Sequence, residues 1–414
     1  MTWHVLDIGS VWVKEFASAL SSFAPTLGWS PVMSWTGLFE CWERSDELLD
    51  PPLQLRHFPL QRGYHRSPLS SLVRLGAVQS RRMRAVAGSP ADSPLVCTTP
   101  FYAPVAEKWD GPVIYYQTDL TYGYGHVDPA AVLAHDRRLC RIATAVCPNS
   151  RRVGDYMVQL AGCDPDKITV IPNATRQSNI LNEAPNGPGP LPDDIADLPH
   201  PIVGVIGNLA GNLNWSLLLA AIDGTPQMTW VFVGPTTMDI EEQSEQARRR
   251  QLLERGGRVR FVGPKPYKAL QQYARSFDAA ILPYRRKDPT YSGSSTRFYE
   301  HLAACRPMIA TRGFEELLRK EPLLTLVDTA DELVQKLEDL ARVQFDDGLT
   351  AARWAASRQG TWHNRALGVI EALGTRWSGD LSIPSKPLVQ HLPEDLFQRH
   401  RSEVFHVIQP DPVR

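Results

Sequence analysis

Short apolar runs alternate with segments of helical period along most of this chain, and this alternation constrains its fold more than any other feature. Runs of three to five apolar residues are too short for helices and are typical of buried strands. Alternation of this kind builds parallel sheets with helices on both faces. The predicted strands lie at residues 5–8, 95–97, 113–116, 143–147, 168–171, 202–206, 229–233, 259–262, 279–282 and 308–311.

One segment, residues 181–200, interrupts the alternation, because it is rich in Pro, Gly and Asp and has no period. A chain of 414 residues also exceeds what one hydrophobic core usually serves. We therefore predict an α/β protein made of two doubly wound, Rossmann-like domains that face a cleft. The predicted parts are a first domain at 1–180, a linker at 181–200, a second domain at 201–360, a helix at 361–375 and a tail at 376–414.

Composition excludes several classes of protein. A net charge of −1 and a pI near 6.8 predict no general attraction to nucleic acid or membranes. The six cysteines form no CxxC pair and none sits near a histidine at metal-ligand spacing, which argues against a zinc site and a disulfide scaffold. The chain also shows no signal-peptide pattern and no run of 18 apolar residues. These features predict a soluble, cytoplasmic protein, at most peripheral to the inner face of a membrane.

The strongest functional signal is a basic, hydroxyl-rich loop at 283–295 that leads into a predicted helix at 296–304. Free backbone amides at a helix start carry partial positive charge and bind phosphate well. Glycine permits close backbone approach, and hydroxyls and cations can add contacts. The predicted phosphate-binding residues are Arg285, Gly293, Ser294, Ser295, Thr296 and Arg297.

Glu300 lies one turn beyond Thr296, on the same face of the predicted helix. A carboxylate at that place can accept two hydrogen bonds from a ribose diol, as acidic residues do in other nucleotide sites. It is not the glutamate of a capping box, since Arg297 stands three positions earlier. The alternative is an ordinary surface glutamate, and the residues alone leave both interpretations open.

The string FYEHLAACRPMIAT, at 298–311, resembles the donor-site segment of family 4 (group 1) glycosyltransferases of the GT-B fold, with the teichuronic-acid type closest. The segments VIYYQTD, AVCPNSRRVGDYM and ITVIPNA resemble the first domain of that family less specifically. The resemblance implies that Glu300 holds the donor ribose and that the helix near 362–373 returns to the first domain. It further implies donor contacts near the base from Gly263 and Lys265, and beneath the phosphates from Gly207 and Asn208.

Two departures from the family pattern keep other functions open. Many members carry a second glutamate eight residues before the first, where this chain has Ser292. Many also place Arg and Lys after the first glycine loop of the second domain, where this chain has GNLAGNLNW. A non-catalytic relative that binds a nucleotide sugar therefore remains an alternative. A nucleotide-sugar epimerase of the same architecture, which needs no acceptor, is a second one.

Two residues are candidates for the general base that would accept the proton of the acceptor hydroxyl. Asp119 follows a predicted strand and would project toward the cleft, although a turn-capping aspartate is an equally ordinary role. His126 lies in the same loop and is of a type that titrates near neutrality, but such a histidine more often hydrogen-bonds its own loop.

The predicted partners are a nucleotide-sugar donor and a hydroxyl acceptor, with no nucleic acid. Residues 61–85 are locally basic with leucines between the cations, which fits contact with anionic lipid or a lipid-linked acceptor, or else a solvated helix face. A helix start and nearby cations would stabilise the departing diphosphate in place of a metal ion, so we expect no metal and no cofactor. The overall prediction is sugar transfer in the synthesis of a cell-surface polysaccharide or glycoconjugate.

Overall fold

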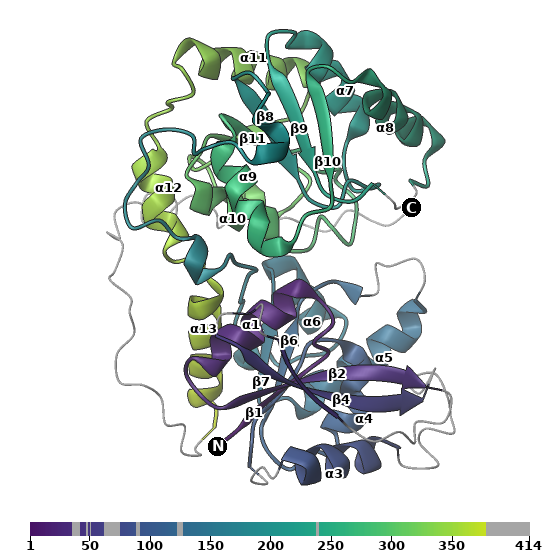
Figure 1. Ribbon diagram of the computed structural model, residues 1–414. Helices are drawn as coiled ribbons and strands as arrows, with labels where there is room; N and C mark the ends of the chain where they lie inside the picture. The colour runs from purple at the N-terminus through teal and green to yellow at the C-terminus, as the bar shows by residue number, and fades with distance from the viewer. Residues whose placement is uncertain are drawn as a thin grey trace. The chain divides into compact units, whose positions relative to one another are not determined.

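The computed structural model describes residues 1–34, 42–46, 49, 51–61, 75–87, 92–121, 127–236 and 240–377 (Figure 1). Residues 1–383 form one compact unit. Two separate sheets are built within it, one from the first half of the chain and one from the second. The α/β fold class with two Rossmann-like domains is therefore confirmed, while the predicted domain boundaries stay predictions.

The first sheet has the strand order β3-β4-β2-β1-β5-β6-β7 among the described residues. Neighbouring strands are parallel except β3 and β4, which pair antiparallel. The sequence did not predict β2, β3 or β4, and the strand predicted at 168–171 is wrong, because only a single bridge joins Ile168 to Val146. The strands are β1 (Trp3–Leu6), β2 (Thr26–Ser34), β3 (Trp42–Asp46), β4 (Leu53–Gln61), β5 (Leu95–Cys97), β6 (Val113–Gln117) and β7 (Ala145–Pro148).

Side-chain caps define where several helices of the first half begin. The oxygens of Ser10, Asp128 and Ser150 accept backbone N–H groups of the first turns of α1, α5 and α6. The core beside these helices contains one fully buried carboxylate, Asp136, which accepts hydrogen bonds from the phenols of Tyr115 at 2.5 Å and Tyr156 at 2.6 Å. The helices are α1 (Val11–Ser21), α3 (Leu75–Ala87), α4 (Ala103–Ala106), α5 (Pro129–Ile142) and α6 (Arg151–Gln159).

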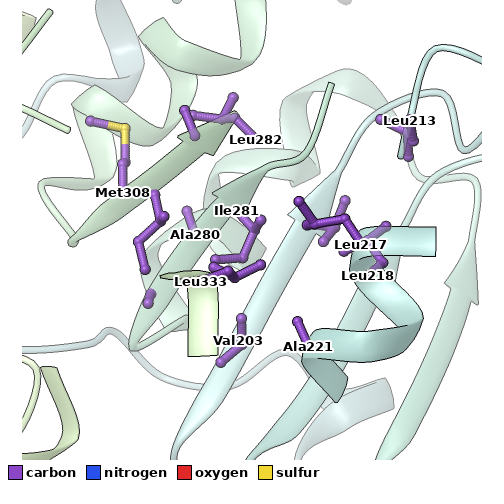
Figure 2. Close-up of a cluster of buried hydrophobic side chains, with 14 of the residues drawn as sticks. Val203, Leu213, Leu217, Leu218, Ala221, Ala280, Ile281, Leu282, Met308 and Leu333 are labelled. Atoms are coloured by element: carbon purple, nitrogen blue, oxygen red, sulfur yellow. The ribbon is translucent and has the colours of Figure 1, made fainter. Parts of the chain in front are cut away.

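The second sheet is entirely parallel, with the order β10-β9-β8-β11-β12-β13. Counted from β8, this is the 3-2-1-4-5-6 order of a dinucleotide-binding fold. Figure 2 shows the core on one face of the sheet, where Leu217 and Leu218 approach Val203 and Ile281. Its strands are β8 (Ile202–Ile206), β9 (Thr229–Val233), β10 (Val259–Gly263), β11 (Ala279–Leu282), β12 (Met308–Thr311) and β13 (Thr325–Val327).

The helices of the second half differ from the prediction at one point. The helical period of residues 354–373 predicts one continuous helix. That prediction is wrong, because one helix ends at Ser357 and the Thr361 hydroxyl caps a new one by accepting the Asn364 N–H at 3.3 Å. The α-helices are α7 (Trp215–Gly224), α8 (Gln243–Arg255), α9 (Leu270–Ser276), α10 (Thr296–Ala304), α11 (Ala330–Arg342), α12 (Thr350–Ser357) and α13 (Trp362–Gly374). Short 3-10 helices lie at Pro100–Tyr102, Pro165–Lys167, Gln177–Asn179, Asp193–Ile195, Tyr267–Ala269 and Glu316–Arg319.

The last helix, α13, packs with the first domain rather than the second. Its buried residues Trp362, Ala366 and Leu373 share a core with Phe16 and Leu20 of α1, and the two helices lie side by side in Figure 1. The first core therefore depends on residues from both ends of the chain. Within the described part of the chain, no helix combines the length and apolar character needed to cross a bilayer.

Candidate functional site

The strand order of the second sheet reverses between β8 and β11, and the candidate site begins there. In open parallel sheets, ligands bind beyond the carboxyl ends of the strands at such a reversal. Gly207 follows β8, and Tyr284 follows β11 after Pro283. The two residues are close to each other: a Cβ placed on Gly207 would lie 3.8 Å from the Tyr284 hydroxyl oxygen.

Three glycines with positive φ form the edge of the sheet at this place. Gly207, Gly234 and Gly263 end β8, β9 and β10 with φ angles of +147°, +143° and +73°. Backbone hydrogen bonds connect the row, from Gly207 N to Val233 O and from Gly234 N to Gly263 O, both at 2.9 Å. A Cβ on Gly234 would stand only 1.7 Å from Gly207 O. Glycine is thus required at position 234 on steric grounds and favoured at 207 and 263 by their positive φ, and the edge presents bare backbone that a phosphate can approach closely.

Of these three glycines, the sequence predicted donor contacts for Gly207 and Gly263 but not for Gly234. A signal was present, since Val-Gly-Pro ends the runs at both 233–235 and 262–264. The sequence does not say, however, that these two strands lie next to each other, so the shared role of the glycines appears only in the sheet.

Beside the glycine edge lies a buried ion pair on α10. The Arg297 guanidinium donates a hydrogen bond to Glu300 Oε2, and Glu300 is only 2% exposed. The other carboxylate oxygen, Oε1, has no hydrogen-bond partner among the described residues although it is buried. A Cβ on Gly207 would lie 3.4 Å from Arg297 Nε. The structure therefore brings together Gly207, Arg297 and Glu300, and leaves an acceptor oxygen unused beside them.

Two tyrosines and Arg297 set the electrostatics of this site. Burial raises the pKa of Tyr284 to about 12. Burial, followed by the charge of Glu300, also raises the pKa of Tyr267 well above its usual range. Burial, the largest single influence on Arg297, would lower its pKa, but the charge and hydrogen bond of Glu300 together with Tyr284 and Tyr267 raise it. At neutral pH the site thus holds the Arg297 guanidinium, already paired with the Glu300 carboxylate, beside neutral phenols that can donate hydrogen bonds to a ligand.

The loop before α10 uses its hydroxyl groups internally. Ser295 caps the helix by accepting the Phe298 N–H at 3.3 Å. The hydroxyl of Ser294 donates to Glu316 Oε2 at 2.7 Å, and the same oxygen accepts the Ser295 N–H at 3.1 Å. Thr296 opens the helix and is half-buried. The predicted phosphate contacts of these hydroxyls remain untested, and in this structure those of Ser294 and Ser295 already have partners.

Residues of the first domain hold the same loop. Asn173 donates its backbone N–H to Ser294 Oγ at 2.9 Å and its side-chain amide to Ser294 O at 2.7 Å. Ser150 donates its hydroxyl to Ser292 O, and Arg152 Nε donates to Ser292 Oγ at 3.2 Å. The position where the family resemblance leads one to expect a glutamate is thus a serine bound by an arginine.

Asp119 lies against the loop from the side of the first sheet. A Cβ on Gly293 would be 3.8 Å from Asp119 Oδ1. The same oxygen accepts the Leu120 N–H at 2.9 Å, which is the turn-capping contact of the alternative interpretation. The carboxylate therefore makes the capping contact and also faces the Gly293 loop. The second candidate base, His126, lies outside the described residues.

Two predicted donor-contacting cations, Arg285 for the phosphates and Lys265 near the base, are held by carboxylates outside the candidate site. Arg285 forms an ion pair with Glu242, and its hydrogen bond lowers the pKa of that carboxyl. Lys265 donates to Asp194 Oδ2 at 2.6 Å. Among the described residues neither cation forms a hydrogen bond to Glu300. Asn208, the residue after Gly207, is exposed. Arg297 is thus the predicted cation that the structure places beside Glu300.

The second domain matches the profile of a known family, described as Glycosyl transferases group 1, over residues 200–342. A curated relative, the putative teichuronic acid biosynthesis glycosyltransferase TuaH of Bacillus subtilis (strain 168), is 27% identical over 112 residues. The alignment covers 27% of this chain and 26% of that relative. The predicted resemblance is therefore confirmed for the segment that carries the glycine edge and Glu300.

Solved structures share the fold along most of the chain. Anabaena Alr3699/HepE, in complex with UDP and glucose, has a TM-score of 0.62 at 17% identity, covering 90% of this chain and 99% of that one. Sucrose-phosphate synthase from Thermosynechococcus elongatus has a TM-score of 0.65 at 16% identity, and the match covers 91% of this chain and 98% of that one. A glycosyltransferase from Rickettsia africae ESF-5 has a TM-score of 0.65 at 13% identity, and the match covers 92% of this chain and 99% of that one. These likenesses show that the chain has the GT-B fold predicted from its sequence.

Proposed function

We propose that this protein is a glycosyltransferase that moves a sugar from a nucleotide-diphosphate donor to a hydroxyl acceptor. The observation that carries the proposal is the buried Glu300 carboxylate, with one oxygen unused, beside Arg297 and the glycine edge. The family match of residues 200–342 supports the same activity. The HepE structure, described as a complex with UDP and glucose, supports a nucleotide sugar as the donor class.

Each group has a role in this reaction. Glu300 Oε1 accepts a hydrogen bond from the donor ribose, and the bare backbone at Gly207 lets the diphosphate approach. Arg297 and the free amides at the start of α10 offset the charge that develops on the departing diphosphate. Asp119, which faces the Gly293 loop, takes the proton from the acceptor hydroxyl. Because Arg297 and the helix start supply positive charge, the proposed transfer needs no metal ion.

We also propose that the acceptor belongs to cell-surface polysaccharide synthesis and is presented at a membrane. The TuaH relative, named for teichuronic acid biosynthesis, supports this context. The described part of the basic segment, α3, exposes Arg81 and leaves Val78 45% exposed, which is a combination of charge and apolar surface that suits anionic lipid. A lipid-linked acceptor would place the protein at the inner face of the membrane.

A ligand panel tests the donor site. Thermal unfolding is followed with nucleoside diphosphates and their sugars, with and without EDTA, for wild type and Glu300→Gln. Glu254→Ala serves as control, since Glu254 is an exposed glutamate of α8. A ligand at about 100 times its Kd adds roughly 2.7 kcal/mol of stability. We expect one nucleotide family to raise Tm in wild type and in the control, independently of EDTA, and to raise it much less in Glu300→Gln.

A second variant separates binding from transfer. Asp119→Asn should keep the donor-induced rise in Tm but lose at least about a hundredfold in transfer rate, as expected when a general base is removed. If no nucleotide raises Tm of the wild type, the donor-site proposal is wrong. If the wild type binds a nucleotide sugar but transfers it to no acceptor and does not convert it, the non-catalytic alternative replaces the proposed enzyme.

A further inference from the structure

A pocket of about 350 Å³ lies where the chain leaves the first domain and passes α9 of the second. Arg176 and Ser178 line it from the segment after the first sheet, and Lys268, Gln272 and Arg275 line it from the region of α9. None of the described residues that form its wall is acidic. The wall thus carries three cationic side chains and no compensating carboxylate of its own.

Arg275 shows most clearly that this pocket is short of negative charge. Its Nη2 donates to the Asn179 carbonyl at 2.7 Å, while its buried Nε has no hydrogen-bond partner among the described residues. Burial lowers the pKa of this guanidinium, which means that the surroundings disfavour its charge. A half-buried arginine without a carboxylate is costly, and an anion supplied from outside would remove that cost.

The other two cations differ in how far they are already compensated. Arg176 forms an ion pair with Glu15 of α1, which lines a neighbouring pocket. Lys268 is exposed, and no ion pair involving it is found in the part of the chain that the structure describes. One paired and two unpaired cations leave the pocket with an excess of about two positive charges, as a phosphate monoester requires.

We propose that this pocket binds the phosphate group of a small phosphorylated metabolite. Arg275 and Lys268 supply charge-assisted hydrogen bonds to the phosphate oxygens. Ser178 and Gln272 can contact the remainder of the molecule. The volume lies in the range of small-molecule sites and exceeds what a bare phosphate ion would fill. The ligand class is therefore an organic phosphate, with a sugar phosphate as its simplest example.

The pocket adjoins the proposed donor site, so its test must separate the two. The guanidinium carbon of Arg176 lies 5.0 Å from the centroid of the Tyr267 ring. Tyr267 in turn is near Glu300, whose charge helps to raise the pKa of its phenol. A phosphate that bound only at the donor site would depend on Glu300 and Arg297. A phosphate in the proposed pocket depends on Arg275 and Lys268 instead.

Calorimetric titration with glucose 1-phosphate and, separately, inorganic phosphate at constant ionic strength provides the measurement. We expect the wild type to bind glucose 1-phosphate more tightly than inorganic phosphate. Arg275→Gln should weaken binding about tenfold or more, and exposed Lys268→Gln severalfold, since each removes a charged hydrogen bond. Arg250→Gln, which removes an exposed cation of α8, is the matched control and should leave the Kd unchanged.

Three outcomes would overturn the proposal. They are no binding by the wild type at millimolar concentration, equal Kd values for wild type and Lys268→Gln, or loss of phosphate binding in Glu300→Gln. Should Arg275→Gln fold poorly, Lys268→Gln decides alone, because its side chain is exposed and contributes little to the core. Failure of the donor panel would leave this result unaffected, since no nucleotide is used.

Discussion

Gly234→Ala is expected to damage the carboxyl edge of the second sheet more than any other alanine substitution at its glycines. The added methyl would stand 1.7 Å from Gly207 O and 2.9 Å from Gly207 C, which are backbone atoms that cannot rotate away. Residue 234 also has a φ of +143°, a conformation that side chains other than glycine rarely adopt. Relief requires β8 and β9 to separate where Gly207 N donates to Val233 O.

The magnitude follows from two contributions. Overpacking of this kind costs about 1–3 kcal/mol, and the backbone strain adds roughly 1–3 kcal/mol, so the total is about 2–6 kcal/mol. Gly257→Ala is the matched control, because Gly257 has a φ of +60° but nothing within 4 Å of its would-be Cβ. Its cost should be about 1–2 kcal/mol, from strain alone.

Thermal and urea unfolding, each followed by tryptophan fluorescence, measure the stability of both variants, and donor titration measures the site. For a domain of this size each kcal/mol lowers Tm by about 2–4 °C, so Gly234→Ala should melt roughly 4–24 °C below the wild type. It should also bind the donor more weakly, because Gly207 lies beside Arg297. If the two variants unfolded at the same urea concentration, the steric argument for the glycine edge would fail.

Two further predictions concern the first domain. Burial raises the pKa of Asp136 from 3.8 to about 6, so the folded state binds this proton more tightly than the unfolded state does. The contribution of Asp136 to the free energy of unfolding therefore falls as pH rises from about 4 to above 6. Asp136→Asn cannot titrate, so its stability relative to wild type should improve by about 2 kcal/mol from pH 4 to pH 7 in denaturant titrations; parallel curves would contradict this. The wild type should sediment with vesicles containing anionic lipid at low salt and be released by salt, while Arg81→Glu should bind less. Equal binding to neutral vesicles, or none at low salt, would argue against the membrane contact.

Sequence periodicity was enough to predict strands β8 to β12 of the second sheet and the start of α10, because these are local features, but it did not predict β13. The apolar runs of β8 to β12 are short and bounded by turn residues, and a serine precedes Thr296 as an N-cap. The long helix predicted over 354–373 was wrong for a local reason as well. Its apolar residues keep a helical period on both sides of Gly360, which hides the break that the Thr361 cap produces.

The composition of the candidate site was harder to predict, since it depends on contacts between distant residues. Nothing near Arg285 or Lys265 in the sequence indicates their partners Glu242 and Asp194, which are 43 and 71 residues away. The internal use of the Ser294 hydroxyl depends on Glu316, which is 22 residues away. Ion pairs and hydrogen bonds over such separations follow from the order of strands, which periodicity does not specify.

The position of α13 has a consequence for how the protein is made. The core of the first domain needs Trp362 and Leu373, while the strands around it end near residue 148 and its last core residue before the second domain is Ala174. During synthesis at about 5–20 residues per second, the roughly 200 residues between Ala174 and Leu373 take about 10–40 s to emerge. The second domain, whose chain is continuous, can therefore fold on the ribosome before the first is complete. The amino-terminal half is thus the half that chaperones would shield longest, and a message truncated before α13 would yield a finished second domain attached to an unfinished first one.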